Sequence, residues 1–171
     1  MKLLILSDSH GLTDELVSIK ERHQDCAIMI HCGDSELEPN HPAMKGFTAV
    51  RGNCDFSGGY PEEIMSLADG LKVLTVHGHL HSVKSSLMNL SYRAREKDAN
   101  IVCFGHSHQL GAEIIDDILF INPGSILMPR GRAEKTYVIL TIDQSELQFD
   151  VYETDGEKLD ELCRNFSLPK E

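Results

Sequence analysis

Residues 2–10 of the chain read Lys-Leu-Leu-Ile-Leu-Ser-Asp-Ser-His, and this stretch carries the main indication of the fold. Its four consecutive apolar residues are typical of a buried strand. The apolar run stops at Ser7, and Asp8 and His10 follow, which are residue types that bind metal ions or transfer protons. Because ligands gather at the carboxyl ends of strands in α/β sheets, this junction predicts the edge of a functional site.

The same arrangement recurs four times further along the chain. Apolar runs at 27–30, 47–50, 71–76 and 101–104 also indicate short strands, and each run leads into polar residues. The candidate ligands that follow these four runs are, in order, Asp34, Asn53, His77, and the pair His106 and His108. A single Asp-x-His is common in proteins, so the prediction rests on the ordered set of seven residues behind five strands.

The segments between and after these runs indicate helices and further strands. Residues 13–23 show helical spacing behind a Thr-Asp pair that can cap the helix. Residues 83–97 predict a second helix, with Ser82 or Ser85 as its cap. The segments 110–115, 118–121, 135–142 and 146–153 are rich in β-forming residues and resemble an antiparallel meander. We therefore predict an α/β fold of packed sheets with helices outside.

Length, charge and cysteine content limit the possible classes of protein. A chain of 171 residues is expected to form a single domain, residues 1–171. Its hydrophobic core is expected to be large enough to fold without support from disulfides or structural metal ions. The formal net charge of -11 repels phosphate backbones, so non-specific binding to nucleic acid is not expected. No segment approaches the length of a membrane span. Five cysteines without a CxxC pair indicate a cytoplasmic protein with reduced thiols.

The seven candidate ligands offer oxygen and imidazole nitrogen and require no thiolate. This set suits manganese, iron, zinc, nickel or cobalt better than a calcium cage or a structural zinc site. Seven ligands exceed the needs of one tetrahedral ion but can hold two ions. Two ions that share a carboxylate, about 3.5–4 Å apart, are an arrangement used in phosphate hydrolysis. We predict a site for two divalent metal ions, with manganese as the expected ion.

In order and spacing, the five blocks resemble the calcineurin-like metallophosphoesterases, above all their small YfcE/YsnB-type phosphodiesterase branch. The resemblance covers nearly the whole chain, including the Asn-Pro-Gly-Ser sequence at 122–125. It implies a four-layer fold, a β-sandwich flanked by helices, and a hydroxide between two metal ions that attacks phosphorus. It also implies two ligand sets that share Asp34 as a bridge: Asp8, His10, Asp34 and His108 for the first ion, and Asp34, Asn53, His77 and His106 for the second.

The resemblance implies an enzyme whose partner is a small phosphate-ester substrate, in the first place a phosphodiester. Phosphomonoesters and pyrophosphates are alternative substrates. A non-catalytic scaffold is a further alternative, because Vps29, a retromer subunit with this fold, serves mainly as an interaction platform. Ligand positions are typically eroded in such scaffolds, whereas all seven are present here, which favours catalysis. No sequence pattern predicts the oligomeric state, so a homo-oligomer is an open possibility.

Cys54 stands where many members of the superfamily carry a histidine that can protonate the leaving group. Without that acid we expect a preference for diesters with good leaving groups, or a proton supplied by water or by His79. His79 is therefore a candidate catalytic or substrate-binding residue. Arg51 precedes Asn53 and is expected either to form a structural ion pair, for instance with Asp55, or to contact the phosphate of a substrate, with the ion pair favoured.

Other polar residues near these motifs have structural interpretations. His31 is expected to be a core or rim histidine with its hydrogen bonds satisfied, and His23 and His41 to lie on the surface. Residues 122–125, which end at Ser125, are expected to form a turn that supports the loop of His106 and His108. Arg130 and Arg132 are predicted to be either solvated loop charges or contacts to an anionic substrate.

Overall fold

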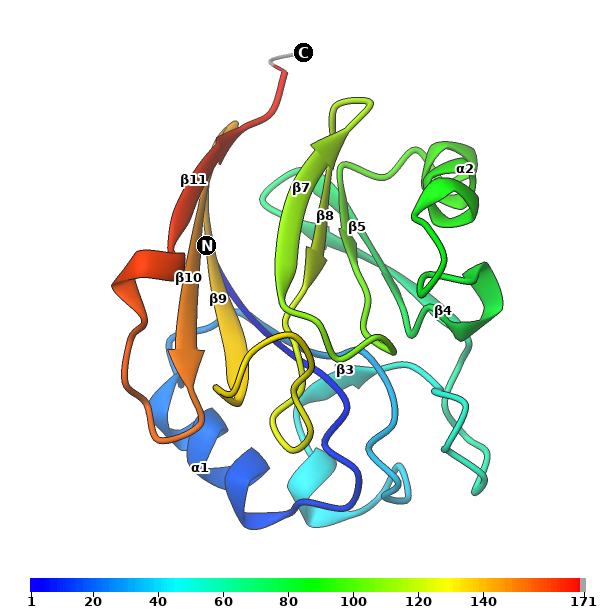
Figure 1. The fold of residues 1–171 in the computed structure, drawn as a ribbon, viewed down its shortest axis with the longest axis vertical. Helices are drawn as coiled ribbons and strands as arrows, with labels where there is room; N and C mark the ends of the chain where they lie inside the picture. The colour runs from blue at the N-terminus through cyan, green and yellow to red at the C-terminus, as the bar shows by residue number, and fades with distance from the viewer. Residues whose placement is uncertain (170–171) are drawn as a thin grey trace.

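The two faces of strand β1 (Lys2–Leu6) organise the architecture, because successive side chains of a strand point to opposite sides. Leu3 and Ile5 point into a core between two sheets. Leu4 and Leu6 point outward and pack with helix α1 (Asp14–Arg22). The computed structural model describes residues 1–169, and Figure 1 shows the two sheets face to face with the helices outside.

The first sheet has six strands and combines both ends of the chain. Its parallel part joins β1, β2 (Ile28–His31) and β3 (Phe47–Ala49). On the other side of β1 the strands run antiparallel. They are, in order from β1, β9 (Thr136–Asp143), β10 (Glu146–Glu153) and β11 (Arg164–Ser167).

The second sheet has five strands in the order β4-β5-β6-β8-β7. Their bounds are β4 (Glu63–Ala68), β5 (Leu71–Val76), β6 (Ile101–Cys103), β8 (Ile118–Asn122) and β7 (Gly111–Ile115). The three central strands, β5, β6 and β8, are parallel. Helix α2 (Met88–Glu96) covers the outer face, where Leu90 and Ala94 pack with residues of these strands. The predicted four-layer order of helix, sheet, sheet and helix is confirmed.

Short 3-10 turns complete the secondary structure: η1 (Pro42–Met44), η2 (His79–His81) and η3 (Asp160–Leu162). The expected N-cap position of α1 holds Thr13, but its side chain makes no capping hydrogen bond. Across residues 1–169, no helix combines the length and the apolar composition that a membrane span requires.

The predicted start of the second helix is wrong. The helix begins at Met88 rather than near residue 83, and residues 82–85 form a turn whose first residue, Ser82, is left-handed (φ 54°). Neither Ser82 nor Ser85 caps the helix. Instead the hydroxyl of Ser86 accepts a hydrogen bond from the amide of Met88, at 3.3 Å.

The late strands form as predicted, but they do not make one continuous meander. Strand β8 pairs in parallel with β6 in the second sheet, whereas β9 pairs with β1 in the first sheet. Turn signals in the sequence cannot indicate that the chain crosses between sheets. The sequence analysis also missed β4 and β11. The Asp69-Gly70 turn, with φ of 50° and 83°, joins β4 to β5 and is a recognisable hairpin signal.

Parallel strands in both sheets direct their carboxyl ends to the same region. The amide of Gly105, after β6, donates to the carbonyl oxygen of His77, after β5, at 2.9 Å. Across the sandwich, a ring nitrogen of His77 lies 2.7 Å from the carbonyl oxygen of Cys32, after β2. The sheet packing therefore brings the predicted ligand positions of the two sheets together.

Removing the apolar contact of α2 is expected to destabilise the protein. Leu90 is fully buried against the second sheet, so Leu90→Ala should lower the free energy of unfolding by about 2–5 kcal/mol. Met88 on the same helix is 58% exposed, so Met88→Ala should change it by roughly 0.5 kcal/mol or less. Urea denaturation measures both values, and equal losses would contradict the packing described.

Candidate metal centre

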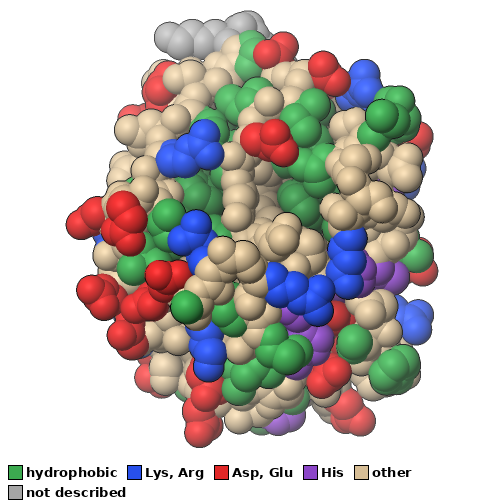
Figure 2. Space-filling view, viewed as in Figure 1, with side chains coloured by type: hydrophobic (Ala, Val, Ile, Leu, Met, Phe, Trp, Pro, Cys, Tyr) green, Lys and Arg blue, Asp and Glu red, His purple; other side chains and the backbone are tan. Residues whose placement is uncertain are grey.

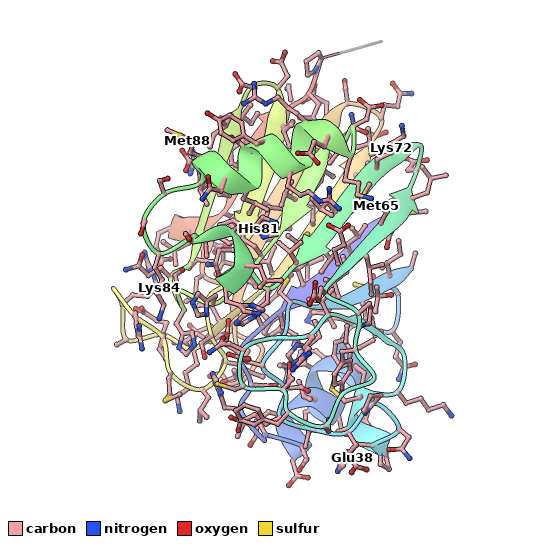
Figure 3. The ribbon with its side chains drawn as sticks, turned by 90° about the vertical axis from the view of Figure 1, so that its right-hand side faces the viewer. Glu38, Met65, Lys72, His81, Lys84 and Met88 are labelled. Atoms are coloured by element: carbon pink, nitrogen blue, oxygen red, sulfur yellow. The ribbon has the colours of Figure 1, made fainter. Side chains whose placement is uncertain are left out.

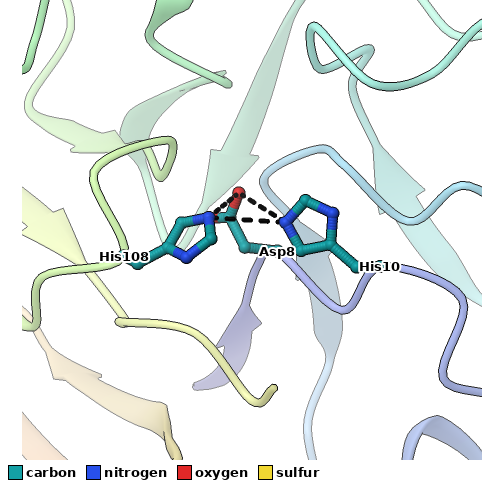
Figure 4. A group of neighbouring side chains, drawn as sticks. All are labelled: Asp8, His10 and His108. Carbon is teal, nitrogen blue, oxygen red and sulfur yellow. Dashed lines mark hydrogen bonds and ion pairs between the residues drawn. The ribbon is translucent and has the colours of Figure 1, made fainter. Parts of the chain in front are cut away.

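All seven predicted ligands lie in one cluster at the carboxyl ends of β1, β2, β3, β5 and β6. Ligand atoms of Asp8, His10 and His108 lie within 4.8 Å of one another (Figure 4). Ligand atoms of Asp34, His77 and His106 form a second such group. The seventh residue, Asn53, places its Oδ1 atom 3.0 Å from Nε2 of His77. The two groups adjoin, because Nε2 of His77 is also 3.8 Å from Oδ1 of Asp8.

Asp8 presents one carboxylate oxygen to the cluster. Its Oδ2 atom accepts hydrogen bonds from the Ser7 hydroxyl at 2.7 Å and from the His106 amide at 3.1 Å. Its Oδ1 atom is buried and accepts no hydrogen bond from any residue between 1 and 169. Nε2 of His108 lies 3.3 Å from this oxygen, and Nε2 of His10 lies 4.0 Å from it. A buried carboxylate oxygen without a donor is costly unless a cation binds there.

Asp34 is oriented in the same way on the other side of the cluster. Its Oδ1 atom accepts a hydrogen bond from the Cys54 amide at 2.8 Å. Its Oδ2 atom lies 3.2 Å from Nε2 of His77 and 4.0 Å from Nε2 of His10. The free oxygen of Asp34 therefore faces a histidine of each group, which is the position that a bridging ligand requires.

The outer hydrogen bonds of the histidines set the direction of their lone pairs. Nδ1 of His77 lies 2.7 Å from the Cys32 carbonyl oxygen, and Nδ1 of His108 lies 2.8 Å from the Met128 carbonyl oxygen. A neutral ring that donates from Nδ1 carries its lone pair on Nε2, which here points at carboxylate oxygens. A nitrogen lone pair and a carboxylate oxygen that face each other repel, whereas a cation between them attracts both atoms. Backbone carbonyls commonly orient metal-binding histidines in this way.

Electrostatics in the cluster favour bound positive charge. Burial acts to raise the pKa of Asp34, but interactions with His77 outweigh it and lower the pKa to about 2. Burial likewise opposes ionisation of Asp8, and contacts with His108 and His77 outweigh it and lower the pKa. Burial acts to lower the pKa of His77, yet both carboxylates raise it above its ordinary value. Protons and metal ions therefore compete for the same positions.

The donor set fits divalent ions that accept oxygen and imidazole ligands. The thiols nearby have raised pKa values, which disfavours their thiolates, although the sulfur of Cys54 lies within 4.8 Å of ligand atoms of His10 and Glu36. Burial raises the pKa of Cys103 to about 12 and that of Cys32 well above its ordinary value. Burial, followed by the charge of Asp34, raises the pKa of Cys54 to about 11. The residues fit manganese, iron, zinc, nickel or cobalt better than a thiolate-bound structural zinc.

The backbone of the cluster is strained in a way that short loops between strands and ligands require. Five site residues have left-handed φ values, which cost about 1–3 kcal/mol each for residues other than glycine. They are Asp8 (56°), His10 (43°), Asp34 (59°), His106 (70°) and His108 (61°). Such strain persists where surrounding contacts hold the chain. The left-handed conformation turns the side chains of these residues toward the ligand cluster.

Two glycines are required because a side chain at either position would overlap with a carboxylate of the site or with its hydrogen-bond partner. A Cβ atom on Gly52 would lie 2.0 Å from Oδ1 of Asp34. A Cβ atom on Gly105 would lie 2.1 Å from the Ser7 hydroxyl oxygen and 2.6 Å from Oδ2 of Asp8. The glycine that precedes Asn53 and the glycine that precedes His106 are therefore needed for close approach of the backbone.

The predicted ion pair between Arg51 and Asp55 is wrong. The buried carboxylate of Asp55 accepts hydrogen bonds from three backbone amides, those of Asp34 and Glu36 at 2.8 Å and of Gly52 at 2.7 Å. Arg51 instead donates from Nε to the backbone carbonyl of Asp55, at 3.2 Å. Asp55 therefore ties the loop after β2 to the loop after β3, a role that sequence analysis missed.

The other polar residues near the motifs are mostly structural. His31 is buried, with Nε2 2.8 Å from the Ser9 hydroxyl and Nδ1 accepting from the Gly33 amide, as expected. The Ser125 hydroxyl donates to the carbonyl of Asp8 at 2.8 Å, so the turn at 122–125 supports the site. His79 is partly buried, and its ring centroid is 5.3 Å from that of His77.

Two histidines that were expected on the surface take part in local structure. Nε2 of His23 lies 2.7 Å from the hydroxyl of the buried Tyr137. Nδ1 of His41 accepts from the Ala43 amide at 3.0 Å and caps η1. Both side chains are partly buried rather than fully exposed.

Known proteins resemble this chain in sequence and fold. The sequence profile of the calcineurin-like phosphoesterase superfamily domain matches residues 1–145. Probable metallophosphoesterase YsnB of Bacillus subtilis (strain 168) is 46% identical over 169 residues, which cover 98% of this chain and all of YsnB (100%).

Solved structures extend the likeness to the whole fold. The crystal structure of a conserved predicted phosphoesterase from Streptococcus pneumoniae TIGR4 has a TM-score of 0.93 at 36% identity, with 97% of each chain covered. Wild-type Vps29 from Entamoeba histolytica, complexed with zinc, has a TM-score of 0.78 at 20% identity. That comparison covers 98% of this chain and 99% of Vps29, and it shows a likeness of fold alone.

Filling the space beside the carboxylates should weaken metal binding. We expect Gly52→Ala and Gly105→Ala to lose roughly tenfold in affinity for manganese, because each added methyl displaces a carboxylate from its anchors. Gly111→Ala is the matched control, since a Cβ atom there meets no heavy atom within 4 Å. Calorimetric titration with manganese measures all three, and unchanged affinity in both site variants would contradict the geometry.

Proposed function

The chain belongs to the calcineurin-like phosphoesterase superfamily, and from this premise we propose that it is a phosphodiesterase that uses two divalent metal ions. Its similarity to probable metallophosphoesterase YsnB supports a metal-dependent phosphoester hydrolase. Hydrolysis of diesters, manganese as the ion and a cytoplasmic location are the further parts of the proposal. The five cysteines are free thiols, which is consistent with a reducing compartment.

One observation carries the proposal, namely that Asp8 and Asp34 each direct one free carboxylate oxygen at histidine nitrogens. Asp8, His10, Asp34 and His108 would hold the first ion. Asp34, Asn53, His77 and His106 would hold the second. When bound, such a pair of ions neutralises phosphate oxygens and lowers the pKa of water that attacks phosphorus. The anchored outer atoms of the ligands keep this arrangement rigid, so that little reorganisation is needed during turnover.

The environment of Cys54 supports a diester with a good leaving group. Its thiol is partly buried, and its raised pKa of about 11 makes it a weak acid near neutral pH. Efficient general acids have a pKa near the working pH, so Cys54 is a poor proton donor to an alkoxide. Leaving groups that depart without protonation are therefore preferred.

His79 is the proposed contact to the substrate next to the ligands. Its Nδ1 atom is buried without a hydrogen-bond partner among the described residues. Burial, followed by the charge of His77, lowers its pKa, so the ring is neutral near pH 7 and can donate or accept one hydrogen bond. A substrate oxygen or an ordered water would satisfy this ring.

Removing the shared carboxylate should abolish turnover of a chromogenic diester such as bis(4-nitrophenyl) phosphate in manganese. Asp34→Asn keeps the acceptor for the Cys54 amide but removes the charge, and we expect a loss of roughly a hundredfold or more in kcat/KM. Asp25→Asn is the control, because Asp25 is an exposed partner of Lys2. Unchanged turnover in Asp34→Asn would overturn the bridging role.

A protein that binds two manganese ions but hydrolyses no diester, monoester or pyrophosphate would support the scaffold alternative. Hydrolysis of monoesters or pyrophosphate without diester turnover would correct the substrate class and keep the metal centre. These outcomes separate the three functions with one panel of substrates.

Supplying an acid at position 54 should change the dependence on leaving group. We expect Cys54→His to accelerate hydrolysis of diesters with alkyl leaving groups by about tenfold or more, and to affect nitrophenyl diesters much less. Cys54→Ser is the control, since serine supplies no better acid. Equal acceleration of both substrates by Cys54→His would refute a missing acid as the cause of the preference.

A further inference from the structure

Two cationic side chains next to the histidine cluster, Lys84 and Arg130, have no acidic partner. Across residues 1–169 neither makes an ion pair or a side-chain hydrogen bond, whereas Arg132 in the same loop lies 3.9 Å from Glu134. The chain has 27 acidic and 16 basic residues, so acidic partners outnumber the cations that they can pair with. Figure 2 shows Lys and Arg side chains beside histidines on one face of the molecule.

The backbone around Arg130 is tied to the first group of ligands. The Arg130 amide donates to the carbonyl oxygen of His108 at 2.9 Å. The carbonyl of Met128, two residues earlier, is the acceptor for Nδ1 of His108. The position of the Arg130 backbone is therefore coupled to that of His108.

The backbone around Lys84 is tied to the second group. The preceding residue, Val83, packs against Gly78, where an added Cβ atom would lie 2.7 Å from a Val83 methyl. The Val83 amide also donates to the Gly78 carbonyl, at 3.4 Å. Gly78 directly follows His77, and Figure 3 shows Lys84 on the connection between η2 and α2.

Both cations lie within electrostatic range of a ligand. The charge of Lys84 acts on the ring of His106. The charge of Arg130 acts on the ring of His108, whose carbonyl oxygen accepts from the Arg130 amide. Two cations beside a pair of metal ions would repel them, and a bound anion that reaches beyond the ions would offset this repulsion.

We propose that Lys84 and Arg130 determine specificity by binding a second phosphate of the substrate, distinct from the phosphodiester that is hydrolysed. This inference rests on the proposed phosphodiesterase function. The metal ions would neutralise the scissile phosphate, so cations outside the ligand ring act on charge elsewhere in the substrate. The acidic surface around the site would repel such a polyanion, and Lys84 and Arg130 supply the local attraction that admits it.

Calorimetry on the manganese-loaded chain tests the proposal with two ligands that differ by one phosphate, adenosine 5′-monophosphate and adenosine 3′,5′-bisphosphate. The unchanged protein should bind the bisphosphate more tightly. Lys84→Gln and Arg130→Gln should each reduce the ratio of the two affinities by about threefold, the size expected for one solvent-exposed ion pair. The double variant should lose the preference.

Two matched variants control for loss of charge alone. Arg132→Gln removes a paired cation from the same loop as Arg130, and Lys45→Gln removes a lysine that follows η1. Both control variants should keep the ratio of the affinities for the bisphosphate and the monophosphate. Equal affinities of the unchanged protein for the two ligands, or a ratio unaltered in Lys84→Gln and Arg130→Gln, would overturn the inference. Diester turnover is measured separately, so failure of the proposed function shows as absent hydrolysis and failure of this inference as an absent bisphosphate preference.

Discussion

The burial of two carboxylates with one free oxygen each is the constraint on which the rest of the structure depends. A buried carboxylate oxygen without a donor is unstable unless a cation pairs with it. Oδ1 of Asp8 is such an oxygen among the described residues, and Oδ2 of Asp34 lies 3.2 Å from Nε2 of His77. The histidine nitrogens beside these two oxygens have outer partners that turn lone pairs toward them. The protein therefore contains a negatively charged cluster whose geometry is complementary to metal ions.

The fold supplies this cluster by combining two sheets at one edge. Parallel strands from both sheets end there, and contacts across the sandwich, such as the His106 amide to Asp8, fix the carboxylates. Left-handed residues directly after the strands turn the ligands inward, and Gly52 and Gly105 give the room for it. The buried core around β1 holds the chain in this strained conformation. The strained site therefore depends on the stability of the sandwich.

The sequence predicted the strands and their ligands because both signals are local. An apolar run that ends in Asp, Asn or His is visible without knowledge of its neighbours. The crossing from β8 to β9, the late start of α2 at Met88 and the role of Asp55 depend on tertiary contacts. The amides that Asp55 binds belong to two separate loops, and residue types alone do not indicate such pairing. Arg130 was predicted from the sequence as either a solvated charge or a substrate contact, whereas Lys84 was not predicted, because its place beside the ligand loops depends on tertiary contacts.

Anomalous diffraction at the manganese edge, from crystals grown with that ion, tests the central claim most directly. The account predicts two peaks in each chain, one among Asp8, His10 and His108 and the other among Asp34, His77 and His106, with Asp34 in contact with both. A single peak, or two peaks without Asp34 as a shared ligand, would contradict it.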